Sequence, residues 1–358
     1  FAIFILLREY KKNNDKLIIT LTCALLIGIF SELSFTLYVD VYGIYNYIGH
    51  LLKFIMYFII FRVIFIQNIR QPYLELSAAK DEIKNYADNL DMIVEQRTEQ
   101  INQIHQKLLD DLEYARDIQM AMLPKKLPNT LRATFEACYF PADRVGGDFY
   151  NVFKLEETKI GMYIGDVSGH GVSAAMLTVF LNQSIKTRKE NNQGIKVTLP
   201  PSEVLANIYS DYNQTDFKSE VYIAMLYGIF DLSTGEFTFS SAGLNVPPMI
   251  VNSSGEVSEL IIRGLPICKF LNGFNVEYND STVKLNKGDK VLFYTDGLTE
   301  AENRDKKVYS DLRLKVQLQK NKNLNALQLT RSITEHVFNF IENCKLRDDI
   351  TFFIMEVK

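Results

Sequence analysis

The sequence of 358 residues has few of the residues on which several functional classes depend. None of its four cysteines (Cys23, Cys138, Cys268 and Cys344) is spaced from another as in a CxxC pair, which argues against zinc-finger and thiol-redox motifs. Positive charge is not in excess, because the net charge is −4, so we expect no nucleic-acid partner. Nine prolines and eighteen glycines exclude a collagen-like or low-complexity chain.

Long apolar runs are confined to the first 72 residues. Residues 17–39 and 48–66 are each long enough to cross a bilayer. Basic residues flank the outer ends of both runs, whereas the connecting segment 40–47 has none, so the positive-inside rule places both outer ends in the cytoplasm. We therefore predict two transmembrane helices in the inner (cytoplasmic) membrane, although two buried helices of a soluble domain would share this pattern. Four tyrosines would form an aromatic belt at the outer interface: Tyr38, Tyr42, Tyr45 and Tyr47.

Three polar residues interrupt the apolar runs. Glu32, His50 and Lys53 are costly in lipid, so they should face a bundle interior, where they could sense something or only pair with one another. The run HLLKFIMYFIIFRVIFIQNIRQPY (residues 50–73) resembles the end of a bacterial membrane-associated sensor domain of the MASE type. Because the chain begins at Phe1 within an apolar run, we expect residues 1–72 to be the end of a longer sensor region.

Residues 73–122 have no glycine or proline and are dense in charge. A seam with alternating steps of four and three runs from Leu76 to Met122, and all but three of its positions are apolar. This pattern predicts a coiled-coil helix that pairs with a second copy as a parallel homodimer. The exceptions, Lys80, Arg97 and Asp111, would suit a helix that changes register, but a static spacer explains them nearly as well.

Carboxylates recur in turn-like settings in the remainder, residues 123–358, and most of them adjoin β-like runs. Converging carboxylates, with few histidines and no thiolate, suit a hard cation such as Mg²⁺ or Mn²⁺. Two such ions could share a carboxylate and hold a water that attacks phosphorus. The four segments are GGD with Asp148, DVSGHG with Asp166, TDG with Asp296, and RDD-I-T with Asp348 and Asp349. Each segment alone is more often an ordinary turn, in which Asp and Gly are common. The evidence for a functional site is therefore the order of the four segments along the chain.

That order resembles the metal-dependent serine/threonine phosphatases of the PPM family (type 2C), and more closely the bacterial SpoIIE-like branch. The resemblance covers residues 111–358. It includes YARDIQ (residues 114–119) followed by LP, the segment SSAG…PP (residues 240–248), and GLP (residues 264–266). It implies an α+β fold, a four-layer α-β-β-α phosphatase sandwich, with flanking helices at residues 172–186 and 324–343.

The resemblance also implies roles for individual residues. Asp148 and Asp166 would be metal ligands, with Asp166 bridging two Mn²⁺ or Mg²⁺ ions, and the carbonyl of Val167 would be a further ligand. Asp296 and Asp348 would complete the second ion's shell. The four aspartates would form the catalytic centre, and no organic cofactor is expected. The residues expected around the metals are Asn151, Asp349, which would orient water, and His170, which is a proton donor or a turn residue.

Two positions depart from the family pattern. The usual GGD-x-x-D ends here in Asn151, which brings no charge, and the histidine usual in SAGH-x-PP is missing from residues 241–248. We expect the second change to affect the substrate surface more than the metals. Arg144 is interpreted as a surface charge, and Ser168 is not needed as a nucleophile.

The leading hypothesis is a membrane-tethered protein serine/threonine phosphatase that acts in bacterial signal transduction. Its coiled coil and phosphatase domain would lie in the cytoplasm, and a signal would reposition residues 112–122. The resemblance implies a substrate that is a small anti-sigma-factor antagonist. The alternative is a non-catalytic signalling scaffold, which Asn151 favours and the retained aspartates oppose. A diguanylate cyclase would leave three of the four segments unexplained, and a histidine kinase would need ATP-binding glycine boxes.

Overall fold

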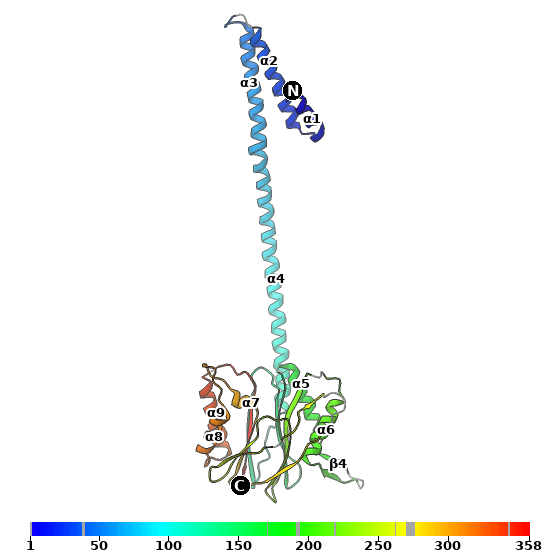
Figure 1. Ribbon diagram of the computed structural model, residues 1–358, viewed down its shortest axis with the longest axis vertical. Coiled ribbons are helices and arrows are strands. Elements are labelled where there is room, and N and C mark those ends of the chain that lie inside the picture. Colours follow the sequence, from blue (N-terminus) through cyan, green and yellow to red (C-terminus); the bar gives the residue numbers. More distant parts are fainter. Residues whose placement is uncertain are drawn as a thin grey trace. The chain divides into compact units, whose positions relative to one another are not determined.

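The structure, a computed structural model, describes residues 2–37, 40–169, 171–190, 194–217, 220–261, 263–269, 276–342 and 344–358 (Figure 1). It divides into two compact units, Phe1–Ile104 and His105–Lys358, each of which is described by itself below. The helix α4 (Gln71–Met122) contributes residues to both units. Its length confirms the long helix predicted for residues 73–122, and it ends just before Leu123–Pro124.

The first unit is helical. Its helices are α1 (Ala2–Asn13), α2 (Lys16–Thr36) and α3 (Ile44–Phe65), followed by the π-helical turn η1 (Ile66–Arg70) and then α4. The helix α2 and the segment that starts at Ile44 are long and apolar enough to cross a membrane. Their apolar side chains are mostly exposed, as at Phe54 with 69% of its surface accessible, which favours a lipid-facing location over burial in a soluble core.

Polar groups join α2 to α3. Lys53 and Glu32 form an ion pair at 3.1 Å, and the hydroxyl of Ser31 donates to the carbonyl of Gly49 at 2.7 Å. The ring of His50 packs edge-on against Phe35. The sequence left open whether Glu32, His50 and Lys53 sense a signal or pair with one another. The structure shows the pair of Glu32 and Lys53, whereas His50 contacts Phe35. Tyr38 of the predicted aromatic belt lies outside the described residues.

The chain stays helical through Pro72, although proline usually ends a helix because it lacks an N–H and clashes with the preceding turn. The wider turn η1 (Ile66–Arg70) immediately precedes it, and α4 begins at Gln71. A proline inside a continuous helix leaves a carbonyl of the preceding turn without its usual N–H partner. A π-helical turn also redistributes backbone hydrogen bonds at such a junction.

The second unit is a sandwich of two antiparallel sheets between helices, so the predicted four-layer α+β fold is confirmed (Figure 1). The first sheet has the order β1 (Ala133–Phe140), β13 (Ile350–Val357), β12 (Lys290–Tyr294), β8 (Met249–Val251) and β9 (Val257–Glu259). The second has the order β11 (Ser281–Lys284), β7 (Glu236–Ala242), β6 (Tyr222–Asp231), β3 (Lys159–Val167) and β2 (Asp148–Lys154), with β10 (Ile267–Cys268) beside β6. A separate hairpin joins β4 (Arg188–Glu190) and β5 (Lys196–Thr198).

Aromatic side chains fill the space between the sheets, with Phe293 and Phe353 stacked at 4.5 Å between ring centroids. Each fully buried phenylalanine contributes about 1.5–3 kcal/mol through the apolar surface removed from water. The outer face of the second sheet is covered by α5 (Val172–Ser184) and α6 (Pro201–Asn213). The outer face of the first sheet is covered by α8 (Asp311–Lys320) and α9 (Ala326–Ile341), and the short α7 (Asp296–Glu300) follows β12. The two predicted flanking helices are therefore present.

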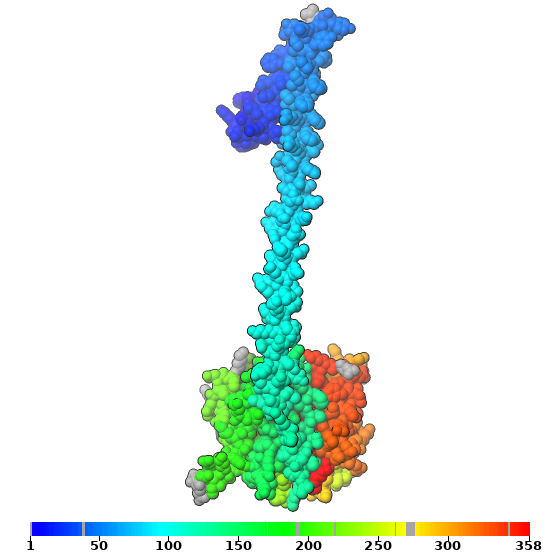
Figure 2. All heavy atoms as spheres, turned by 180° about the vertical axis from the view of Figure 1, so that it is seen from behind, coloured from blue at the N-terminus to red at the C-terminus, as the bar shows by residue number. Residues whose placement is uncertain are grey.

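The last turns of α4 lie on the surface of the second unit (Figure 2). Gln119 is only 5% exposed there and is held by residues of the GGD segment and of α5. The helix thus contributes a buried polar side chain to this unit, in addition to connecting it to the chain before it.

Candidate metal centre

The candidate metal centre is built where strands of both sheets end. Asp148 begins β2 and Asp166 is near the end of β3, and the strand register places them directly opposite each other. Asp296 follows β12, while Asp348 and Asp349 precede β13. Because β12 and β13 are antiparallel neighbours, the end of one lies beside the start of the other. Four segments far apart in the sequence therefore meet at one end of the sandwich.

Hydrogen bonds join the two sheets at this end. The hydroxyl of Thr295, which follows β12, donates to Asp148 Oδ2 at 2.7 Å. The backbone N–H of Asp148 donates to Asp349 Oδ2 at 3.2 Å, and that of Ala142 donates to Asp349 Oδ1 at 2.8 Å. Both oxygens of Asp349 are therefore engaged in fixing the loop that leads into β2.

Burial and like charge act together on these carboxylates. Burial, followed by the charges of Asp166 and Asp349, raises the pKa of Asp148 well above its usual range. The pKa of Asp166 rises to about 7, first through burial and then through the charges of Asp348, Asp296 and Asp349. Groups that disfavour one another's ionised form in this way are stabilised by a bound cation. Perturbed carboxylates are typical of functional sites.

The glycines of the GGD segment allow a close approach of oxygen atoms. A methyl group at Gly147 would lie 2.8 Å from the carbonyl oxygen of Val167 and 3.1 Å from Asp166 Oδ1. A methyl group at Gly146 would lie 2.1 Å from Asp349 Oδ2. Only glycine fits at either position. Two of the predicted ligand oxygens, the carbonyl oxygen of Val167 and Asp166 Oδ1, therefore lie close together beside Gly147.

A cavity of about 130 Å³ opens beside these carboxylates, and Asp166, Thr295, Asp296 and Asn245 line it. Among the described residues, no three carboxylate, thiol or imidazole groups lie close enough together to form a complete set of metal ligands by themselves. Asp166 and Asp296 line the cavity, whereas Asp148 and Asp349 are buried behind it, close enough for their charges to act on one another. The donor set consists of carboxylate and carbonyl oxygens, which is the chemistry that Mg²⁺ and Mn²⁺ prefer, so the residues fit such an ion.

The remaining predicted residues lie at different distances from this centre. Asp348 is exposed and accepts a hydrogen bond from the N–H of Asp349 at 2.8 Å, and its charge still acts on Asp166. Asn151 is not brought together with the carboxylates. It is three residues after Asp148, on the opposite face of β2, and it hydrogen-bonds the hydroxyl of Tyr163. His170 lies outside the described residues.

Two polar residues considered for other roles have structural partners. The guanidinium of Arg144 pairs with Glu113 of α4 at 2.8 Å, in agreement with its interpretation as a surface charge. The hydroxyl of Ser168 accepts a hydrogen bond from the backbone N–H of Tyr222 at 2.9 Å.

Three residues of the site were missed from the sequence. Asn245 donates to Asp296 Oδ2 at 3.1 Å, and Thr295 holds Asp148. Gln119 donates to the carbonyl of Gly146 at 2.7 Å and accepts from its N–H at 3.1 Å. All three lie inside motifs quoted above: Asn245 in SSAG…PP, Thr295 in TDG and Gln119 in YARDIQ. The sequence signal that could have identified them is a polar residue within a motif that already carries a predicted ligand or precedes the domain.

Comparison with known proteins agrees with this geometry. Residues 156–358 match the family Stage II sporulation protein E (SpoIIE), and residues 1–72 match the membrane-associated sensor domain MASE3. The class defined by the fold and site is that of the PP2C-type phosphatases, which are metal-dependent. The chain belongs to the SpoIIE family and carries a membrane-associated sensor domain at its N-terminal end.

Individual relatives are distant. Protein IcfG of Synechocystis is 28% identical over 261 residues, which are 67% of this chain and 40% of IcfG. The phosphoserine phosphatase RsbU of Bacillus subtilis is 23% identical over 257 residues, which are 71% of this chain and 72% of RsbU. This chain therefore spans well under two thirds of the length of IcfG but nearly three quarters of RsbU.

Solved structures share the fold. The SiaA-PP2C domain of Pseudomonas aeruginosa superposes with a TM-score of 0.59 at 23% identity, covering 71% of this chain and 98% of that domain. The PP2C phosphatase domain of SpoIIE from B. subtilis, with a fragment of its regulatory domain, gives a TM-score of 0.51 at 20% identity, covering 63% of this chain and 62% of that one.

Proposed function

We propose that this protein is a membrane-tethered, metal-dependent phosphatase that removes phosphate from serine or threonine of a regulatory phosphoprotein. The observation that carries the proposal is the meeting of Asp148, Asp166 and Asp296 at one end of the sandwich. Asp166 and Asp296 line one cavity there, and the pKa values of Asp148 and Asp166 are raised. Membership of the SpoIIE family supports it, as do the relatives named phosphoserine phosphatases, RsbU and RsbP of B. subtilis. We further propose that the substrate is a small anti-sigma-factor antagonist.

Two Mn²⁺ or Mg²⁺ ions would be held by Asp148, Asp166, the carbonyl of Val167, Asp296 and Asp348. When bound, such ions supply Lewis acidity that activates water and offsets the negative charge of a phosphoryl group.

The protein's own contribution is to hold the ligands in place. Thr295 orients Asp148, and Asn245 orients Asp296. Gln119 and Asp349 hold the loop that carries Asp148, Gln119 through Gly146 and Asp349 through the N–H of Asp148 itself. Ligands fixed by a supporting layer of hydrogen bonds keep the geometry that catalysis needs.

We propose three functional parts for the chain. Residues 1–72 would anchor it in the inner (cytoplasmic) membrane, and residues 73–122 would pair with a second copy as a parallel coiled coil. Residues 123–358 would be the catalytic domain on the cytoplasmic side. The apolar seam of α4 is exposed in the single chain, for example at Leu76, Leu90 and Ile101, which supports a partner helix. A signal would then act on the turn that carries Gln119.

The alternative of a non-catalytic scaffold had Asn151 in its favour. That residue faces away from the carboxylates, so its missing charge does not weaken the ligand set. Calorimetric titration of the chain with Mn²⁺ separates the two functions. The enzyme should bind Mn²⁺, whereas the absence of detectable Mn²⁺ binding would favour the scaffold.

The experiment that tests the proposal uses the full chain in lipid nanodiscs with Mn²⁺ or Mg²⁺. Phosphate release from p-nitrophenyl phosphate and from a phosphoserine peptide should require the metal. Asp296→Asn should lower the rate by at least about a hundredfold, the usual scale for removing a catalytic charge. The matched control is Asp305→Asn, an exposed carboxylate in a turn, which should leave the rate unchanged. Full activity in Asp296→Asn would overturn the mechanism.

A further inference from the structure

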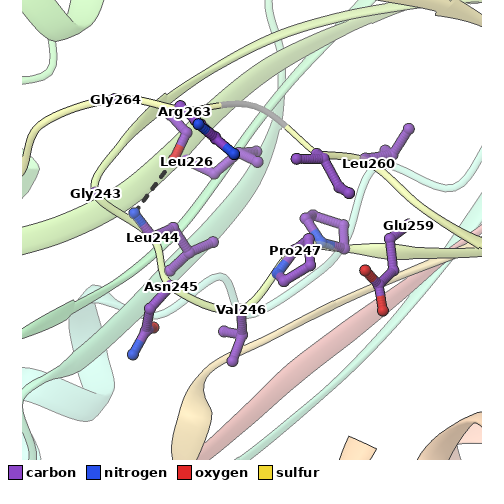
Figure 3. Close-up of a pocket in the computed structure, with 13 residues that line it drawn as sticks. Leu226, Gly243, Leu244, Asn245, Val246, Pro247, Glu259, Leu260, Arg263 and Gly264 are labelled. Carbon is purple, nitrogen blue, oxygen red and sulfur yellow. Dashed lines mark hydrogen bonds between the residues drawn. The ribbon is translucent and has the colours of Figure 1, made fainter.

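A second, larger hollow of about 520 Å³ lies beside the candidate metal centre (Figure 3). Its floor and near wall come from the loop between β7 and β8, and its far wall comes from the residues after β9. It is referred to below as the β7–β8 pocket. The loop is the segment in which the sequence departs from the family pattern, with Leu244, Asn245 and Val246 between Gly243 and Pro247.

The β7–β8 pocket adjoins the metal cavity. Gly243, Leu244 and Asn245 line both spaces, so one wall separates them. Asn245 also donates to Asp296 Oδ2 at 3.1 Å, which ties this wall to the ligand set. The N–H of Leu244 donates to the hydroxyl of Ser241 at 3.2 Å, the contact dashed in Figure 3. A molecule that occupies the pocket can therefore extend a phosphorylated residue towards the metals.

The walls combine an apolar surface with one unpaired positive charge. Leu244, Val246, Pro247 and Leu260 supply apolar surface, and Ile261 is 69% exposed although it is apolar. Within the residues that the structure describes, Arg263 has no ion pair or hydrogen bond, and it is one of the lining residues labelled in Figure 3.

The opposite rim of the pocket carries a negative charge that is already paired. Glu259 is held by Lys315 at 2.6 Å. The charge that the pocket offers to a ligand is therefore positive, and it is contributed by Arg263.

We propose that the β7–β8 pocket binds the segment of the phosphoprotein substrate that flanks its phosphorylated residue. An apolar side chain of that segment packs between Leu244 and Ile261, and an acidic side chain pairs with Arg263. This inference rests on the proposed phosphatase function and adds the substrate class to it: a phosphoprotein with apolar and acidic residues beside the phosphoserine. A protein segment is favoured because the pocket has apolar walls, carries the charge of Arg263 and shares three lining residues with the cavity of the candidate metal centre.

The test uses the full chain in nanodiscs with Mn²⁺ and three phosphoserine peptides of equal length. The first has leucine and aspartate on both sides of the phosphoserine, the second has serine in place of leucine, and the third has lysine in place of aspartate. The wild type should prefer the first by about five- to tenfold in kcat/KM, the range of a rim charge pair plus partial apolar burial. Equal rates for all three peptides would overturn the proposal.

Two variants assign the preference to the pocket. Ile261→Ser should abolish the preference for leucine, and Arg263→Glu should reverse the preference to the lysine peptide. Matched changes at exposed positions elsewhere, Leu312→Ser on α8 and Arg331→Glu on α9, should retain the wild-type preference. Retention of the wild-type preference in both pocket variants would contradict the assignment.

Hydrolysis of p-nitrophenyl phosphate, which has no flanking residues, is the readout that separates the possible failures. Ile261→Ser and Arg263→Glu should leave its rate unchanged. An equal loss on this substrate in Arg263→Glu would mean that Arg263 contacts the phosphate itself, which overturns docking of an acidic side chain. Absence of metal-dependent hydrolysis of this substrate in the wild type would instead refute the proposed function.

Discussion

Replacement of Gln119 by alanine tests whether the end of α4 supports the metal centre. Gln119 is buried, and it satisfies both the carbonyl and the N–H of Gly146, two residues before Asp148. It also contacts the hydroxyls of Thr178 and Tyr139, at 3.3 and 3.5 Å. Alanine removes all of these contacts without adding a new one.

The expected cost follows from the groups left unpaired. Each buried backbone group without a partner costs about 1–3 kcal/mol, so the pair at Gly146 should cost about 2–4 kcal/mol, because water can enter part of the space. For a unit of this size, about 1 kcal/mol lowers Tm by about 2–4 °C, so a decrease of roughly 4–15 °C is expected. The loop that carries Asp148 would also loosen, and the Mn²⁺ concentration for half-maximal activity should rise.

The assay is thermal unfolding of the full chain in nanodiscs, together with a Mn²⁺ titration of phosphatase activity. Gln106→Ala is the matched control, because Gln106 lies on the same helix, is exposed and bonds only Asp110, one turn away. Such a pair contributes about 0.2–0.5 kcal/mol. If Gln119→Ala behaves like Gln106→Ala in both measurements, the helix does not support the site and the reasoning is refuted.

Three further predictions concern the metal centre itself. Gly147→Ala should abolish Mn²⁺ binding in calorimetry, because its methyl group would displace the carbonyl of Val167 and Asp166 Oδ1; unchanged affinity would count against these ligands. Thr295→Val removes the donor to Asp148 and should lower metal affinity by about tenfold, the scale of losing a supporting hydrogen bond, while Thr295→Ser should retain it. Without metal, the raised pKa of Asp166 should stabilise the fold at low pH, and that stability should be lost as pH rises from about 4, the pKa of an unfolded aspartate, through about 7. The loss should be at most about 4 kcal/mol and should disappear with saturating Mn²⁺; a metal-free chain of constant stability from pH 5 to 8 would contradict the proximity of the charges.

Much of the fold was predictable because local patterns agree with tertiary structure. The β-like runs that adjoin Asp296 and Asp349 in the sequence are β12 (Lys290–Tyr294) and β13 (Ile350–Val357), since each is an apolar run bounded by turn residues. The long helix before the sandwich follows from its heptad seam and from the absence of glycine and proline. The π-helical turn before Pro72 could not be foreseen, because it depends on how the helix relieves a local clash.

The candidate site was predictable in its residues but not in its supporting contacts. The order of the four acidic segments identified Asp148, Asp166 and Asp296. The structure places Asp166 and Asp296 at one cavity and Asp148 directly opposite Asp166 in the strand register. The partners Gln119 and Asn245 are 27 and 51 residues away from the groups they hold, so only the folded chain shows them. The separation of Asn151 from Asp148 follows from the alternation of side chains along a strand, a signal that was present in the sequence.

The most direct test of the central claim is a Mn²⁺ titration of the full chain and of Asp166→Asn, followed by calorimetry and by phosphate release from a phosphoserine peptide. The account predicts that hydrolysis by the wild type rises with metal occupancy, and that the variant loses both binding and hydrolysis. Hydrolysis that persists in Asp166→Asn, or that proceeds in the wild type without any divalent ion, would contradict it.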